Sequence, residues 1–255
     1  MPRAERAPED GRIALSGAAT PPAEALALLA TGDMEVLGLM PDASNSTFLA
    51  RVRDDRSSLL AVYKPRAGEA PLWDFPPGSL SGREVAAYLL SAALGWPSVP
   101  PTIFRDGPHG PGAIQVFIEA DFEHHFFTLR DRHPDEFRAV AAFDVIANNA
   151  DRKGGHCLLG PRGRIWVIDH GVCFSSEPKI RTVIWDFAGE PVPPALLADV
   201  CRVAEELRTG AIRGELRAFL TEAEVDATAA RADALARSGR FPHPLGRRPY
   251  PWPPV

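Results

Sequence analysis

The chain is poor in cysteine and lysine, and it has no long apolar run. Its three cysteines form no Cys-x-x-Cys pair, which argues against a structural zinc site or a disulfide framework and favours a reducing compartment. No segment reaches the length of a membrane span, and the N-terminus lacks the apolar core of a signal peptide. We therefore expect a cytoplasmic protein with no membrane span.

An excess of basic charge is also absent. The net charge is −5 and the sequence pI is about 5.8, so we expect no nucleic-acid partner. Lysine occurs only at positions 64, 153 and 179. Because lysine is a compact point charge that fits a phosphate site, Lys64 and Lys153 become candidates for phosphate binding.

The most informative stretch is 143–171, FDVIANNADRKGGHCLLGPRGRIWVIDHG. It predicts a helix, a loop and a β-hairpin. Phosphoryl transfer needs positioning and charge stabilisation more than covalent help, and the stretch offers groups for both tasks. We predict Asp151 as the catalytic carboxylate, Lys153 as a ligand of the γ-phosphate or substrate, and His156 and Asp169 as metal ligands. The alternative is that these residues only satisfy ordinary turns.

Two other features of this stretch have predicted structural roles. Asp144 lies on the helix side that faces the loop and should brace it. Gly154 and Gly155 should allow a sharp turn into His156.

The order of predicted elements indicates the fold class. A helix opens at Pro21 and ends at Gly32, and further helices are expected at 81–94, 134–149, 194–207 and 221–238. Strands are expected at 35–40, 46–52, 59–63, 102–105 and 113–119. This pattern predicts an α+β, two-lobed protein-kinase-like fold with an antiparallel β-rich N-lobe, a mainly helical C-lobe and the nucleotide between them.

The same pattern predicts the domain organisation. We expect a flexible N-terminal arm (1–20), an N-lobe with the nucleotide-binding sheet and helix (21–118), a C-lobe with the catalytic and metal-binding loops (119–240), and a Pro-rich tail (241–255) without a catalytic signal.

The N-lobe holds the predicted nucleotide-binding residues. Lys64 ends an apolar strand and is expected to contact the phosphates, with Glu84 as its partner. The alternative for Glu84 is a capping box with Ser81. The segment between the first two strands is expected to bind phosphate through Ser44, Asn45, Ser46 and Thr47. The strand that links the lobes is expected to bind adenine through Gln115, Phe117 and Ile118.

With these residues identified, the chain resembles an actinobacterial family related to phosphatidylinositol 3-/4-kinases, with HipA-like and CotH-like kinases as wider relatives. The loop Asn149 to His156 resembles Asn-x-Asp-Arg-His-x-x-Asn, although Lys153 replaces His and His156 replaces Asn. The resemblance covers roughly residues 34–190. It implies Asp151 as catalytic aspartate, Asp169 as metal aspartate and Lys64 with Glu84 as the phosphate-binding pair.

We therefore expect an ATP-dependent kinase that uses Mg²⁺ or Mn²⁺ and transfers a phosphoryl group to a hydroxyl of protein Ser/Thr or a small polyol. A lipid acceptor is disfavoured because the chain has no basic membrane-binding face. One alternative is a nucleotide-binding pseudokinase that regulates a protein partner. Another is a metal-dependent hydrolase using His156, Asp169 and His170 with His124 or His125.

Overall fold

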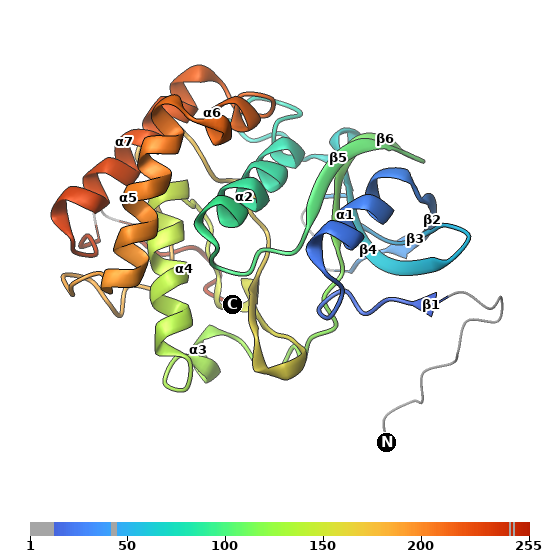
Figure 1. Cartoon of the computed structure of the whole chain (residues 1–255), viewed down its shortest axis with the longest axis horizontal. Helices are drawn as coiled ribbons and strands as arrows, with labels where there is room; N and C mark the ends of the chain where they lie inside the picture. The colour runs from blue at the N-terminus through green and yellow to red at the C-terminus, as the bar shows by residue number, and fades with distance from the viewer. Residues whose placement is uncertain (1–12, 42–44, 245, 247) are drawn as a thin grey trace. The chain divides into compact units, whose positions relative to one another are not determined.

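The computed structural model describes residues 13–41, 45–244, 246 and 248–255 (Figure 1). The chain forms two compact units. The first contains the described residues up to Pro71 together with Pro100–Glu119, and the second contains Leu72–Val99 and Ala120–Val255. Residues 72–99 thus group with the helical unit, whereas the predicted N-lobe had included them.

The first unit is built on a six-stranded sheet. Its main path runs β2-β3-β4-β6-β5 and is antiparallel throughout, which confirms the predicted strands. The strands are β2 (Asp33–Leu39), β3 (Phe48–Arg53), β4 (Ser57–Pro65), β5 (Thr102–Gly107) and β6 (Gly110–Val116). The helix α1 (Pro22–Thr31) buries Ala25, Leu28 and Leu29 within this unit.

The period-2 pattern of β4 sets the position of Lys64. Leu59, Ala61 and Tyr63 are buried, so the alternate residues Val62 and Lys64 point to the opposite face of the sheet. Lys64 is the next-to-last residue of β4, where the strand pairs with Ala113 of β6 and the pairing with β3 has ended at Tyr63.

Part of the predicted N-terminal arm is placed on this sheet. The short strand β1 (Ile13–Ala14) pairs in parallel with β4, and Leu15 N donates to Ser58 O at 2.7 Å. Gly17 lies so close to Phe117 O that an added Cβ would stand 2.3 Å away. Ile13 and Ala14 therefore extend the sheet, and the segment as far as Gly17 stays in contact with this unit.

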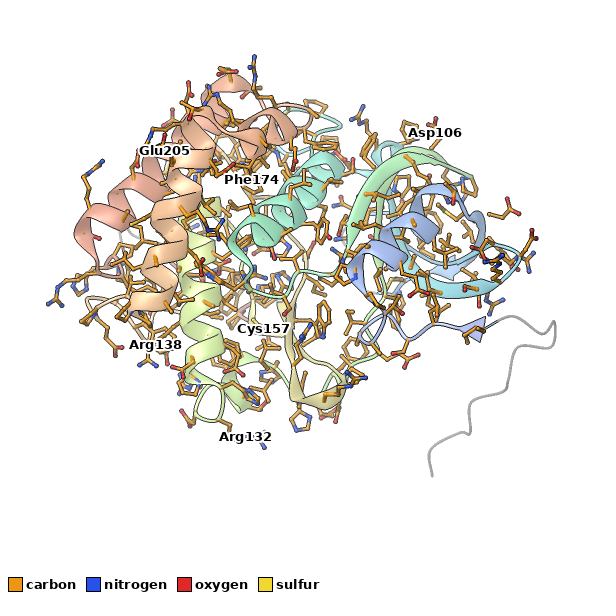
Figure 2. All side chains as sticks on the ribbon, viewed as in Figure 1. Asp106, Arg132, Arg138, Cys157, Phe174 and Glu205 are labelled. Carbon is orange, nitrogen blue, oxygen red and sulfur yellow. The ribbon has the colours of Figure 1, made fainter. Side chains whose placement is uncertain are left out.

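The second unit is helical and carries one β-hairpin (Figure 1). The predicted helices are confirmed as α2 (Leu80–Leu94), α4 (Pro134–Ala147), α5 (Pro194–Thr209) and α7 (Glu222–Ser238), and α3 (Phe126–Leu129) and α6 (Ala211–Leu216) are additional. Strands β7 (Cys157–Leu159) and β8 (Ile165–Val167) form the hairpin. Buried side chains such as Cys157 and Phe174 lie among the helices (Figure 2). No described helix is long and apolar enough to cross a membrane.

The capping-box alternative for Glu84 is wrong. Helix α2 begins at Leu80 with Ser79 at the N-cap, so Ser81 lies inside the first turn and is buried. The side chain of Ser79 makes no capping bond, and its hydroxyl donates to Pro76 O instead. Glu84 is therefore available for a tertiary contact.

Candidate functional site

The catalytic loop begins where α4 ends at Asn148. This residue has a φ of 52°, a left-handed conformation that asparagine tolerates better than most residues. Its side-chain amide donates to Ser175 O and Glu177 O and accepts from Lys179 N, at 2.9, 2.7 and 2.9 Å. The backbone of Asn148 thus ends the helix, and its side chain fixes the segment that follows the metal-binding loop.

A buried ion pair holds the loop against α4. The guanidinium of Arg152 contacts both carboxylate oxygens of Asp144 at 3.0–3.1 Å, and both side chains are fully buried. Burial by itself would lower the pKa of Arg152, but the charge and hydrogen bonds of Asp144 offset this and raise it, so the guanidinium stays charged. Asp144 also accepts from Asn149 Nδ2 at 3.0 Å and from Thr182 Oγ1 at 3.2 Å. Asp144 therefore occupies the bracing position that the sequence predicts.

Arg152 also joins the catalytic loop to the metal-binding loop. It donates to Ile168 O at 2.9 Å and to His170 Nε2 at 2.7 Å. Because a guanidinium can only donate, Nε2 of His170 is the acceptor in this contact. His170 is thus committed to this buried network, which weighs against its use as a hydrolase metal ligand.

The hairpin brings His156 and Asp169 together. Ile168 N donates to His156 O at 3.0 Å, and His156 Nε2 lies 3.3 Å from Asp169 Oδ2. Asp169 has a φ of 63°, in the left-handed region where a non-glycine residue is uncommon and often functional.

His156 and Asp169 offer two of the ligands that the predicted divalent metal needs. Within the described part of the chain, no group of three or more His, Cys, Asp and Glu side chains is placed to hold a metal ion. One carboxylate and one imidazole fit an ion whose other ligands are phosphate oxygens and water, and imidazole suits Mn²⁺ better than Mg²⁺.

Asp151 lies in the loop that precedes the hairpin, near enough to Asp169 for the charge of Asp169 to act on its carboxyl. Its backbone N–H donates to Asn149 Oδ1 at 3.0 Å, and Lys153 Nζ stands 3.5 Å from its Oδ2. Burial raises the pKa of the Asp151 carboxyl, the ammonium of Lys153 opposes this rise, and the charge of Asp169 adds to it. A carboxylate with a raised pKa beside a cation is suited to orient a hydroxyl and accept its proton.

Glu84 reaches the metal-binding loop from α2. Its Oε2 accepts from His170 N at 3.0 Å, and both residues are buried. The neighbouring Arg83 donates to Cys173 O at 2.7 Å and forms a buried ion pair with Glu224 of α7. Helix α2 is therefore fixed to the segment around Asp169. The pairing of Glu84 with Lys64 stays a prediction.

In the first unit, several groups of the predicted phosphate loop have partners within the unit. Asn45 Oδ1 accepts from Ala70 N at 2.7 Å, Ser46 N donates to Gly68 O at 2.9 Å, and Thr47 is buried. Ser44 lies outside the described residues. These bonds stabilise the turn, and they occupy one donor that a phosphate would need, the Ser46 amide.

The predicted adenine-binding strand is also largely engaged. Gln115 is buried and donates to Thr102 Oγ1 at 2.9 Å, and Phe117 N donates to Leu60 O at 2.9 Å. Ile118 is buried, beyond the end of β6 at Val116. The Phe117 amide and the Gln115 side chain therefore serve the sheet, and an adenine contact through this segment stays a prediction.

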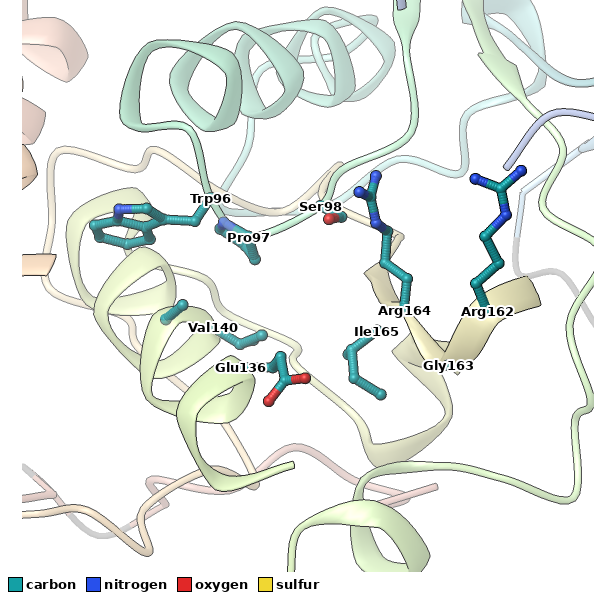
Figure 3. Close-up of a pocket in the computed structure, with 10 residues that line it drawn as sticks. Trp96, Pro97, Ser98, Glu136, Val140, Arg162, Gly163, Arg164 and Ile165 are labelled. Carbon is teal, nitrogen blue, oxygen red and sulfur yellow. The ribbon is translucent and has the colours of Figure 1, made fainter. Parts of the chain in front are cut away.

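A pocket of about 360 Å³ lies elsewhere in the second unit (Figure 3). It is formed by the turn after α2, one side of α4 and the hairpin turn, with the side chains of Trp96, Glu136, Val140, Arg162, Arg164 and Ile165. The predicted site residues are not part of its lining.

Comparisons with known proteins agree with this geometry at the level of the fold. The chain has a TM-score of 0.55 to the crystal structure of the Golgi casein kinase, at 14% identity, covering 88% of this chain and 79% of that one. The predicted kinase-like fold is thereby confirmed. A rice (Oryza sativa subsp. japonica) phosphatidylinositol 4-kinase gamma 4 is 28% identical over 138 residues, which cover 46% of this chain and 24% of the rice protein.

One similarity extends over nearly the whole chain. No protein-family model matches the sequence. Protein Rv2133c of Mycobacterium tuberculosis is 40% identical over 262 residues, covering 89% of this chain and 94% of that protein. At this identity and coverage, the chain belongs to the same family as mycobacterial protein Rv2133c.

Proposed function

We propose that the protein is an ATP-dependent phosphotransferase, related to phosphatidylinositol 3-/4-kinases, that acts on a hydroxyl of protein Ser/Thr or a small polyol. The observation that carries this proposal is the contact of His156 with Asp169 at 3.3 Å, together with the charge of Asp169 acting on the Asp151 carboxyl in the preceding loop. The partial match to the rice kinase and the kinase-like fold support it.

In the proposed reaction, the acceptor oxygen forms a bond to the γ-phosphorus while the bond to the departing ADP oxygen breaks. Asp151 orients the hydroxyl and takes its proton, and Lys153 stabilises negative charge beside it. His156 and Asp169 would hold Mg²⁺ or Mn²⁺, which supplies charge neutralisation on the phosphates. Arg152 keeps the two loops in register through Asp144 and Ile168 O.

Calorimetric titration with ATP tests the binding half of this proposal. We expect binding that requires Mn²⁺ or Mg²⁺ and that weakens about tenfold or more in Lys64→Ala and in Asp169→Ala. Arg51→Ala, an exposed cation on β3, and Asp131→Ala, an exposed carboxylate, are matched controls that should bind as the parent does. If ATP fails to bind under every metal condition, the proposal is wrong.

The pH dependence of turnover tests the role of Asp151. Its pKa is raised, so ATP consumption should fall as the pH decreases through a value above the ordinary ~3.9 of aspartic acid. Lys153→Met removes the cation that opposes this rise and should move the acid limb to higher pH, whereas Lys153→Arg should keep it near the parent position. An acid limb that does not move in Lys153→Met, at fixed metal concentration, would contradict this assignment.

A regulatory nucleotide-binding module is the second candidate. The observation that favours it is the substitution at the site itself, where an imidazole takes the place of an oxygen ligand and Lys153 lies 3.5 Å from the proposed base. This candidate predicts ATP binding without consumption.

The cysteines bear on where the protein acts. All three are free, and burial raises the pKa of Cys157 to about 12, so this neighbour of His156 is no nucleophile. Because free thiols are typical of a reducing compartment, we propose that the protein acts in the cytoplasm.

A further inference from the structure

The C-terminal segment Pro249–Val255, here called the strap, contacts the catalytic loop. Pro254 O accepts from Gly154 N at 2.8 Å. At the other end of the strap, Pro249 O accepts from Thr182 N at 3.1 Å and from Trp185 Nε1 at 3.0 Å. The chain end accordingly lies near the segment that leads into the hairpin (Figure 1).

The two segments that the strap contacts are themselves paired. Arg152 N donates to Arg181 O at 2.9 Å, and Val183 N donates to Arg152 O at 3.1 Å. The strap therefore spans a two-segment ladder next to Asp151. Two of its three bonds to the ladder segments come from the main-chain amides of Gly154 and Thr182, and the third comes from the Trp185 indole.

The loop that the strap contacts contains two adjacent glycines, Gly154 and Gly155. Neither has a positive φ, so the predicted sharp turn is not their reason. A Cβ on Gly154 would lie 2.9 Å from the Phe127 ring and 3.4 Å from Pro254 O, and one on Gly155 would lie 3.9 Å from Val255 Cγ1. Close packing is thus the requirement at Gly154. Because glycine loses the most conformational freedom on ordering, this loop depends on neighbouring contacts to stay fixed.

The composition of the strap suits it to this task. Prolines stand at 249, 251, 253 and 254, and proline restricts the unfolded chain, so ordering the strap costs less entropy. Pro251 is buried, whereas Trp252 is 89% exposed. The anchor is therefore Pro251, and the large aromatic ring beside it contributes little to holding the strap.

We propose that the strap is a positioning element of the active site: it holds residues 153–156 and so fixes Lys153 and His156 relative to Asp151 and Asp169. This proposal rests on the proposed phosphotransferase function for its catalytic consequence. The placement of the strap itself is measurable without any activity.

The test uses two glutamate variants of the full chain. Pro251→Glu puts a charge at a buried position and should detach the strap, whereas Trp252→Glu puts the same charge one residue away at an exposed position. In Pro251→Glu we expect hydrogen exchange at the Gly154 amide, the Thr182 amide and the Trp185 indole to accelerate about tenfold or more, as local opening would produce. Trp252→Glu should match the parent.

An internal reference and a kinetic readout complete the test. The Trp96 indole donates to Asp199 Oδ2 at 3.0 Å, a bond that involves no residue of the strap, and its exchange should stay unchanged in both variants. In Pro251→Glu, kcat for ATP consumption should fall about tenfold, with a smaller change in KM, because a displaced loop impairs chemistry more than binding.

Each outcome either supports or overturns the proposed role of the strap. Unchanged exchange in Pro251→Glu, or faster exchange with unchanged kcat, overturns the proposal. If Pro251→Glu does not fold, Pro254→Gly keeps the carbonyl and loosens the segment, and it should change the same probes in the same direction. A parent protein that consumes no ATP refutes the proposed function, whereas the exchange data still decide whether the strap holds the loop.

Discussion

Replacing Asp151 by Asn should reduce ATP turnover by about 10²–10⁴-fold, the range expected when a general base is removed. The amide keeps the size of the carboxylate and cannot accept a proton at neutral pH. The expected ATP affinity is close to that of the parent, because Asp151 is proposed to act on the acceptor hydroxyl and not on the nucleotide. Single-turnover kinetics and calorimetry on the same preparation measure the two quantities.

A matched aspartate provides the control for this variant. Asp121→Asn changes a carboxylate that is 58% exposed and bonded to His124, and it should leave turnover unchanged. Asp151→Asn with parent-like turnover would remove Asp151 from the chemistry. Loss of ATP binding together with turnover would instead assign Asp151 to the nucleotide or its metal.

Asp144→Ala should lower the free energy of unfolding by roughly 3–5 kcal/mol, because it leaves the Arg152 charge buried without its partner. The loss also frees the Asn149 and Thr182 side chains that Asp144 now binds. Urea denaturation followed by circular dichroism measures the change. Asp135→Ala on the same helix removes an exposed carboxylate, and its expected cost is about 0–1 kcal/mol.

A double replacement separates lost charge pairing from lost packing. Asp144→Leu with Arg152→Met removes both charges, so it should be markedly more stable than Asp144→Ala alone. The bonds from Arg152 to Ile168 O and His170 would still be absent. A double variant that is less stable than Asp144→Ala would mean that these bonds, and not the ion pair, dominate the stability of the loop.

Local sequence signals were sufficient for most of the fold. Proline at the start and glycine after the end bounded α1, and Gly95 at a φ of 85° ended α2 as the sequence predicts. The alternation of apolar residues in β4 placed Lys64 on the face opposite Tyr63. These features depend on neighbours within a few positions along the chain.

Contacts between distant positions were beyond such signals. Arg83 and Glu224 are 141 positions apart, and Glu84 and His170 are 86 apart, so neither pair has a periodicity that would reveal it. The capping-box pattern at Ser81 was misleading because the N-cap is Ser79, two residues earlier, and Glu84 binds the metal-binding loop. Propensity at a helix end is worth about 1 kcal/mol, which a buried tertiary contact can override.

The candidate site shows the same division. The order Asp151, His156, Asp169 was readable from the sequence, and the structure places His156 beside Asp169. The role of Arg152 as the link between the two loops was missed, since an arginine beside a loop aspartate is not distinctive by itself. The available signal was Asp144, a carboxylate on an otherwise apolar stretch of helix that needs a buried partner, which Arg152 provides.

Transfer of the terminal phosphate tests the central claim most directly. Purified protein is incubated with ATP labelled on the γ-phosphate, with Mn²⁺ or Mg²⁺, and label leaving ATP is measured in the parent and in Asp151→Asn. The proposed function predicts metal-dependent release or transfer that Asp151→Asn suppresses. ATP that binds and stays intact with both metals would contradict catalysis and support the regulatory nucleotide-binding module instead.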